Sequence, residues 1–273
     1  MRTAETAWRQ LLFSILKGGR EVSPRGQKTL EVLHTNIVRC DLANAVVTSP
    51  LRKMAYGFMC AEALWIQDGD NRVEPLVKFN PRMAQFSDDG VTLAGAYGPR
   101  IMPQFQYVVD ALKKDRDTRQ AVLTIWTPNP TPSKDLPCTV AMTFSIREGL
   151  LHQHVFMRSS DAWLGVPYDL FSFSLVGVRV ACEYNAQARE DLKLMLGTLS
   201  VSITSSHLYE QHFDAARAVL TEWSHDMVAD PIPQALIRDG AWDAIYDSVA
   251  QQRDDKRSTP AWVVRPYLRG GDK

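Results

Sequence analysis

The sequence predicts an α+β fold in a single domain. Segments with helical periodicity and segments with alternating periodicity follow one another without the regular strand, helix, strand rhythm of a doubly wound sheet. No internal repeat and no low-complexity tract divides the 273 residues. A chain of this length can also build a substantial core on its own. We therefore treat residues 1–273 as one domain.

Hydrophobic spacing predicts the individual elements. Apolar residues with helical spacing indicate helices at residues 4–18, 50–67, 105–115 and 168–181. Apolar and β-branched runs indicate strands at residues 29–39, 120–126, 139–147, 150–159 and 199–209. The pair Gly18-Gly19 ends the first helix, and the proline-rich segment TPNPTPSKDLP separates two of the strands.

Composition points away from nucleic-acid and membrane binding. The 31 basic and 31 acidic residues give a formal net charge of +0, so an anionic ligand must be bound by a local basic cluster. No apolar run approaches the roughly 18 to 20 residues that span a bilayer. The first 20 residues are interrupted by Arg9, Gln10 and Lys17, which indicates an amphipathic helix and not a signal peptide.

Cysteine usage predicts the redox environment. The four cysteines are scattered without a CxxC pair, which argues against a zinc site or a disulfide framework; they are Cys40, Cys60, Cys138 and Cys182. We expect reduced thiols, a cytoplasmic protein and no metal. Neither a GxGxxG turn nor a GxxxxGK[ST] loop is present, so no dinucleotide or P-loop site is indicated.

A glutamate stands in the predicted helix 50–67, which is apolar on almost every side. Glu62 is conspicuous there because a carboxylate is costly to bury without a partner. It either reaches the surface or pairs with a nearby arginine, or it belongs to a functional site.

Cys138 lies at the start of a predicted strand, directly after the proline-rich loop. A single cysteine is most often a buried structural residue. Arg158, on the next predicted strand, is within plausible reach and favours the nucleophilic thiolate. Arg158, Ser159 and Ser160 also place a guanidinium beside two hydroxyls, a combination that suits a phosphate, although such a run is only a turn in most proteins.

Several motifs in register resemble thymidylate synthase. PC at residues 137–138, RSSDAWLGVPYD at 158–169 and HLY at 207–209 follow in the family's order, as do EALWIQDGD at 62–70, GAYG at 95–98 and DTRQAVLTIW at 117–126. The resemblance covers about residues 5–215. It implies a large mixed β-sheet flanked by helices, and a homodimer in which two such sheets pack against each other.

The resemblance also implies roles for individual residues. Cys138 would add to carbon 6 of a pyrimidine, so that carbon 5 attacks 5,10-methylenetetrahydrofolate. Glu62 would order water and move protons, and Tyr97 would assist proton removal from carbon 5. Asp161, Gly165, Phe79 and Phe86 would contact the folate. The nucleotide would be held by Arg25, Arg158, Ser159, Ser160, His207 and Tyr209, and by Arg119 of the partner subunit.

Asp169 departs from the synthase pattern, because synthases carry an asparagine where this chain reads GVPYD. An asparagine amide matches the N3–H donor and O4 acceptor of uracil. Cytosine protonated at N3 presents two donors, and a carboxylate can accept both. Asp169 therefore predicts a cytosine nucleotide, dCMP above all. The alternative is that Asp169 caps the N-terminus of the following helix.

Other departures favour hydroxymethyl over methyl transfer. Thr139 and Gln120 replace a histidine and an arginine of the synthases, and no tryptophan occurs between Trp65 and Trp126. These features resemble the deoxycytidylate 5-hydroxymethylase branch that bacteriophages use to modify DNA precursors, which would place a phage-encoded protein in the host cytoplasm. In that branch water captures the one-carbon unit and tetrahydrofolate is released.

Alternatives remain within and outside the enzymes. They are a CMP hydroxymethylase, a dUMP hydroxymethylase, a thymidylate synthase of unusual sequence, and a non-catalytic nucleotide- or RNA-binding homologue. The motifs do not distinguish deoxyribose from ribose. Residues after about 220 resemble the family less, and the segment TPAWVVRPYLRGGDK at 259–273 is an open candidate for a closing flap.

Overall fold

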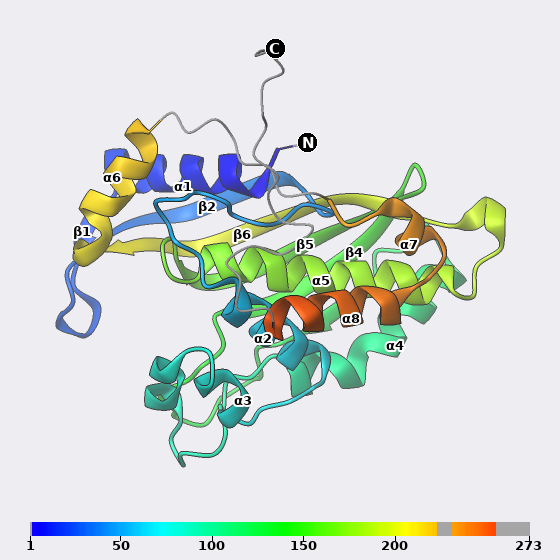
Figure 1. Ribbon diagram of the computed structural model, residues 1–273, viewed down its shortest axis with the longest axis horizontal. Coiled ribbons are helices and arrows are strands. Elements are labelled where there is room, and N and C mark those ends of the chain that lie inside the picture. Colours follow the sequence, from blue (N-terminus) through cyan, green and yellow to red (C-terminus); the bar gives the residue numbers. More distant parts are fainter. Residues whose placement is uncertain (1, 223–230, 255–273) are drawn as a thin grey trace, which may run out of the picture.

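Six strands form one mixed sheet in the computed structural model, which describes residues 2–222 and 231–254 (Figure 1). Its order is β1-β2-β6-β5-β4-β3. Neighbours pair antiparallel except β5 and β6, which run parallel. The strands are β1 Arg20–Val22, β2 Thr29–Asp41, β3 Val122–Thr124, β4 Thr139–Arg147, β5 Leu150–Asp161 and β6 Met195–Tyr209.

The helices gather on one face of this sheet (Figure 1). They are α1 Ala4–Gly18, α2 Tyr56–Gln67, α3 Glu74–Val77, α4 Gly98–Lys114, α5 Val166–Asn185, α6 Phe213–Thr221, α7 Gln234–Arg238 and α8 Trp242–Asp254. Short 3₁₀ turns lie at Pro24–Gly26, Pro81–Phe86, Glu190–Leu192 and Glu210–His212.

Helix α5 is the centre of the core. It is apolar on nearly every side and is buried by the sheet and by α2, α4 and α7. At Gly177 an added Cβ would lie 2.5 Å from Gln153 Oε1 on β5 and 3.3 Å from the methyl groups of Leu42, so a larger residue would force these side chains to move. Helix α5 therefore packs directly on β5 and β6.

Alternation along the strands separates the two faces of the sheet. On β5, Leu151, Val155 and Met157 are buried under the helices, whereas His154 and Phe156 point to the opposite face. In a sheet that is covered by helices on one side only, alternate side chains of a strand are buried and the others are exposed.

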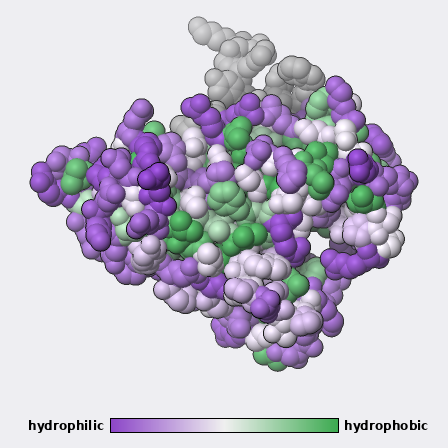
Figure 2. Space-filling model, turned by 180° about the vertical axis from the view of Figure 1, so that it is seen from behind, coloured by the Kyte–Doolittle hydropathy of each residue, from purple (hydrophilic) through white to green (hydrophobic). Residues whose placement is uncertain are grey.

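The opposite face of the sheet carries exposed apolar side chains. Leu33, Val38, Val140 and Phe156 are all at least 36% exposed, and hydrophobic residues gather near the middle of the face seen in Figure 2. A hollow on these strands is lined by residues 34–36, 140, 156–157 and 202–204.

The α+β class and the mixed sheet flanked by helices are confirmed, and two helix starts were wrong. Helix α2 begins at Tyr56 and not near residue 50, because Lys53 adopts φ +48°, which no α-helix contains. Helix α4 begins at Gly98 and not at residue 105; it includes Pro103, which has no backbone N–H to donate within the helix.

Strand β3 and helix α8 also differ from the prediction. Strand β3 is shorter than predicted because it lies at the sheet edge and pairs on one side only. Helix α8, which packs on α2, was not predicted. The proposed flap segment 259–273 lies outside the described residues. Among the helices that are described, none is long and apolar enough to cross a membrane.

Candidate active site

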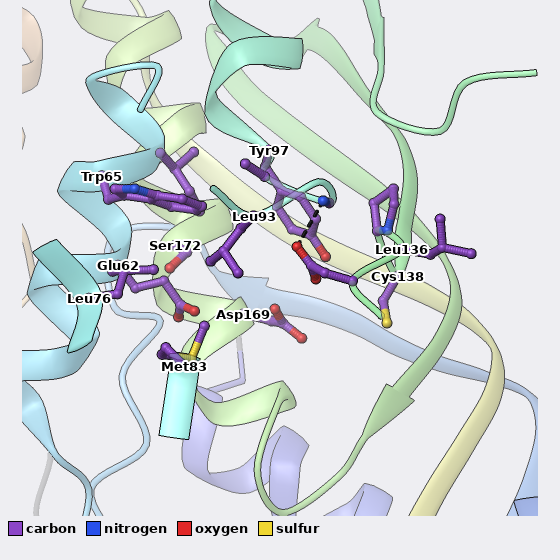
Figure 3. A pocket seen from close by; sticks show the side chains of 15 residues that line it. Glu62, Trp65, Leu76, Met83, Leu93, Tyr97, Leu136, Cys138, Asp169 and Ser172 are labelled. Atoms are coloured by element: carbon purple, nitrogen blue, oxygen red, sulfur yellow. Dashed lines mark hydrogen bonds between the residues drawn. The ribbon is translucent and has the colours of Figure 1, made fainter. Parts of the chain in front are cut away.

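A pocket opens where α2, the start of α5 and two loops converge (Figure 3). The loops are residues 93–97, which lead into α4, and residues 135–138, which lead into β4. It encloses about 150 Å³, less than the roughly 300 Å³ at which whole-ligand sites begin. The enclosed part therefore suits a reacting ring, with the remainder of a ligand outside it. It is lined by Glu62, Trp65, Ile66, Leu76, Met83, Leu93, Gly95, Ala96, Tyr97, Asp135, Leu136, Pro137, Cys138, Asp169 and Ser172.

Cys138 is the cysteine that faces this pocket. The other three cysteines are buried in the core, where burial raises the pKa of each thiol to about 12. Burial also raises the pKa of the Cys138 thiol, but the charge of Arg158 and the hydroxyl of Ser159, 3.7 Å from Sγ, act in the opposite direction. The thiolate is thus favoured at Cys138 relative to the structural cysteines.

Arg158 fastens the loop that carries the cysteine. Its Nε donates to the carbonyl of Pro137 at 3.0 Å, and Nη2 donates to the carbonyl of Leu136 at 3.0 Å. Nη1 donates to Ser159 Oγ at 3.1 Å. A guanidinium has five N–H groups, so the exposed Arg158 keeps donors for an anion. The predicted proximity of Arg158 and Cys138 is confirmed.

Glu62 and Asp169 project into the pocket from α2 and α5 (Figure 3). Both keep some accessible surface because they face the cavity, yet protein encloses them. Burial, with a smaller contribution from the charge of Asp169, raises the pKa of Glu62 to about 8. Glu62 makes no ion pair with any described residue, so the arginine-pairing alternative is wrong within that part of the chain. It holds its proton at neutral pH.

Asp169 is less perturbed than Glu62. Burial raises its pKa to about 6, while a hydrogen bond from Ser160 Oγ, 3.2 Å from Oδ2, acts against this shift. Helix α5 starts at Val166 with Gly165 as N-cap, so the helix-cap alternative for Asp169 is wrong. A Cβ on Gly165 would lie 3.2 Å from Ser160 Oγ and 3.4 Å from Asp169 Oδ2, so glycine leaves room for that hydrogen bond.

Tyr97 is held by the residue that follows the cysteine. The backbone N–H of Thr139 donates to Tyr97 Oη at 3.3 Å, and Thr139 Oγ1 donates to it at 3.1 Å. Burial keeps the pKa of Tyr97 well above its usual range. The phenol is therefore protonated at neutral pH, and it lines the same pocket as Cys138 (Figure 3).

Four further predicted residues lie on the flank beyond Cys138. Asp161 pairs across the sheet with His207, whose ring contacts Tyr209 edge-on at 5.4 Å. The charge of Arg25 lowers the pKa of Tyr209, against the rise caused by burial, so Arg25 belongs to this neighbourhood. Asp161 Oδ1 accepts from the N–H groups of residues 163 and 164. Its Oδ2 is buried with no hydrogen-bond partner among the described residues.

The remaining predicted residues lie apart from the pocket. Arg119 is exposed in the turn before β3. Phe79 and Phe86 are 36% and 39% exposed and do not line the pocket, whereas Met83 between them does. Their contact with folate stays a prediction. No described group of three or more His, Cys, Asp or Glu side chains is arranged to hold a metal ion.

Asp135 is a third carboxyl in the pocket, and no sequence motif predicted it. Its Oδ2 accepts from the N–H of Gly95 at 2.8 Å, the bond drawn as a dashed line in Figure 3. Burial raises the pKa of Asp135, while that N–H and the charge of Arg100 lower it. The one signal in the sequence was its position three residues before Cys138.

The chain was compared with known proteins. A family model described as Thymidylate synthase matches residues 6–247. A deoxyuridylate hydroxymethyltransferase of Bacillus phage SP01 is 29% identical over 256 residues, which covers 82% of this chain and 66% of that protein. A deoxyuridylate hydroxymethyltransferase of Delftia phage PhiW-14 is 30% identical over 207 residues, covering 68% of this chain and 56% of that protein.

The chain therefore spans just under two thirds of the length of the first of these relatives and little more than half of the second. The family match, in contrast, extends over nearly all of the described residues. It contains the pocket, the cysteine and every carboxyl that faces them. The chain belongs to the thymidylate synthase family.

Proposed function

We propose that this protein is a pyrimidine-nucleotide 5-hydroxymethyltransferase that uses Cys138 as its nucleophile and dCMP as its preferred substrate. The observation that carries the proposal is the convergence of one pocket-facing thiol with Glu62, Tyr97 and Asp169. The relatives named as hydroxymethyltransferases support the reaction type. The departures from the synthase pattern at Thr139 and Asp169 support the same assignment.

The first step is addition of the Cys138 thiolate to carbon 6 of the base. The Arg158 guanidinium stabilises the thiolate and, through its bonds to the loop carbonyls, orients it. Addition makes carbon 5 nucleophilic. Tyr97, held by Thr139, lines the same pocket as Cys138 and would assist removal of the proton from carbon 5.

Glu62 acts first as an acid in this scheme. Because the pKa of Glu62 is about 8, its carboxyl is protonated at neutral pH and can donate a hydrogen bond or a proton to the base or to water in the pocket. Loss of that proton above pH 8 would leave a charge in a poorly solvated site. A role as an acid would explain why Glu62 makes no ion pair with any residue that the structure describes.

Methylenetetrahydrofolate would supply the one-carbon unit at formaldehyde oxidation level, so water capture needs no hydride. The residues present fit such a ligand. Asp161 Oδ2 has no hydrogen-bond partner among the described residues and could accept from a ring N–H. The pocket wall offers the apolar side chains of Leu76, Met83 and Leu93. We propose that these residues, with Gly165 leaving space beside them, hold the folate.

Asp169 supports cytosine as the base. With one proton shared between the carboxyl and N3, Asp169 accepts from N3–H and from the N4 amine through charge-assisted bonds. Ser160 holds the carboxyl in place. The phosphate and sugar would extend past Cys138 to Arg25, Arg158, Ser159, His207 and Tyr209, outside the enclosed part of the pocket. Ser160 would contribute to nucleotide binding through Asp169, because its hydroxyl donates to that carboxyl.

Uracil is the second candidate base, and two observations favour it. The relatives are named for deoxyuridylate. The pKa of Asp169 is raised to about 6, so a minor protonated fraction exists at neutral pH. A protonated carboxyl can donate to O4 and accept from N3–H, as an amide does.

Product mass distinguishes these assignments. The protein is incubated with methylenetetrahydrofolate and, separately, dCMP, CMP and dUMP. We expect dCMP to gain the mass of CH₂O. A gain of CH₂ would mean methyl transfer, and exclusive reaction of dUMP would overturn the cytosine assignment. No reaction with any of the three nucleotides would overturn the proposed function.

We also propose that the protein is a homodimer that packs sheet against sheet. The sheet face away from the helices exposes Leu33, Val38, Val140 and Phe156, and an exposed apolar patch is typical of an interface. A hydrogen-bonded row of Asn36, Ser202 and His154 crosses the same face. In this dimer Arg119 of each subunit would reach the phosphate in the site of the other.

Hybrid dimers test the shared site. Cys138→Ser and Arg119→Ala should each be nearly inactive, because one lacks the nucleophile and the other a phosphate ligand. When the two variants are mixed and their subunits exchange, half of the dimers become hybrids. Each hybrid has one of its two sites intact, so about a quarter of wild-type activity should return. Sedimentation gives the oligomeric state. Absence of any recovery in an exchanging dimer would exclude the shared Arg119.

A further inference from the structure

We infer that Asp135 is the base that takes a proton from water when water captures the one-carbon unit. This inference rests on the proposed hydroxymethyl transfer. It assigns to the pocket a catalytic residue on the loop that carries the nucleophile, three positions before Cys138.

The placement of Asp135 is specific. Its carboxyl lines the pocket together with Cys138 and Tyr97. Gly95 N–H binds Oδ2 at 2.8 Å, and a Cβ on Gly95 would lie 2.9 Å from Oδ1, so the carboxyl packs closely against the turn before Tyr97. Among the described residues no hydrogen bond to Oδ1 occurs. One carboxylate oxygen is thus anchored, and the other remains for a water molecule.

The other two pocket carboxyls suit the task less well. Glu62 holds its proton at neutral pH, since its pKa is about 8. Asp169 accepts a hydrogen bond from Ser160 and, in the proposed function, also binds the edge of the base. Asp135 alone receives both a backbone N–H and the charge of Arg100, which favour its ionised form against the effect of burial. The charge of Asp135 is also felt by the Cys138 thiol, whose pKa it raises.

The step balances without an oxidant or a reductant. After carbon 5 loses its proton and the folate amine departs, an exocyclic methylene remains on the nucleotide, which is still bonded to Cys138 through carbon 6. Water oxygen bonds to the methylene carbon as its proton passes to Asp135, and the alkene electron pair moves into the ring. That pair then forms the C5–C6 double bond while the C6–S bond breaks, which returns the Cys138 thiolate.

Asp135→Asn removes the basic oxygen and keeps an acceptor for Gly95 N–H. Formation of hydroxymethyl nucleotide should fall about a hundredfold, the usual contribution of a general base. With 2-mercaptoethanol present, tritium release from carbon 5 should continue within about threefold of wild type, because a thiol attacks the methylene without that base. The nucleotide product should then carry the thioether.

A second measurement needs no folate. If Asp135 is ionised beside Cys138, Asp135→Asn should lower the apparent pKa of the thiol, so that alkylation of Cys138 by iodoacetamide accelerates at lower pH than in the wild type. An unchanged alkylation profile would mean that Asp135 carries no charge there, and it would overturn the inference.

Asp110→Asn is the matched control. Asp110 is exposed on α4, accepts from Gln106 Nε2 at 2.9 Å, and does not line the pocket. It should change neither product formation nor the alkylation profile. Equal loss of tritium release and product in Asp135→Asn would show a structural role and overturn the inference. Failure of the wild type to make any hydroxymethyl product would refute the proposed function instead.

Discussion

Cys138→Ser should abolish turnover, with a loss on the order of 10³-fold or more, because a serine hydroxyl is hardly ionised at neutral pH. Nucleotide affinity should stay within about threefold, since the proposed phosphate and base ligands are untouched. Product formation by mass spectrometry gives the first quantity, and calorimetric titration with dCMP gives the second. The same titration with dUMP shows whether the preference for a base already appears in nucleotide binding or only in the covalent steps.

The control for this variant is another cysteine. Cys182 on α5 is fully buried and has no access to the pocket. Cys182→Ala should lower stability through a small cavity but retain turnover per folded molecule. If Cys138→Ser instead lost nucleotide binding together with its cooperative thermal transition, Cys138 would be a structural residue and the assignment of the nucleophile would be wrong.

Asp169→Asn should reverse the choice of base. The amide of asparagine makes one hydrogen-bonding mismatch with cytosine, and the carboxylate of aspartate makes one mismatch with uracil. Each buried mismatch costs roughly 1 to 3 kcal/mol of binding free energy. The ratio of kcat/KM for dCMP to that for dUMP should therefore swing on the order of 10³-fold towards dUMP. Kinetics with both nucleotides at a fixed folate concentration measure it.

The pH dependence gives an independent readout of Asp169. The complex with cytosine holds one proton between carboxyl and N3, and the free carboxyl, with a pKa of about 6, loses that proton as the pH rises. The kcat/KM of the wild type for dCMP should therefore decline as the pH rises through about 6. The reference for this decline is the kcat/KM of Asp169→Asn for dUMP at the same pH. An asparagine does not titrate, so the variant lacks this limb.

Ser160→Ala separates base recognition from support of the carboxyl. It removes the hydrogen bond to Oδ2, which raises the pKa of Asp169 further, but it leaves the carboxyl in the pocket. The preference for dCMP should persist, with the pH limb moved to higher pH. An unchanged base ratio in Asp169→Asn would contradict the proposed role of Asp169 whatever Ser160→Ala does.

Local sequence patterns were sufficient to predict the fold class and most of the sheet. Strands such as 139–147 carry a local alternation that requires one buried and one open face, and the structure has β4 with the same bounds. Local signals were misleading where backbone conformation is set by packing. Lys53 adopts a left-handed conformation that its residue type does not predict, and α4 begins at Gly98, before the periodic segment 105–115 that predicted it.

The site, like the fold, was predictable from the sequence only in part. Motifs in order along the chain identified Cys138, Glu62, Tyr97 and Asp169, and the structure brings them into one pocket. Their protonation depends on packing between distant segments, since the pKa of Glu62 is set by how completely α2 and α5 exclude water from it. Tertiary structure alone also revealed Asp135, because a carboxylate in a proline-rich loop becomes part of the pocket only when that loop folds against the turn at Gly95.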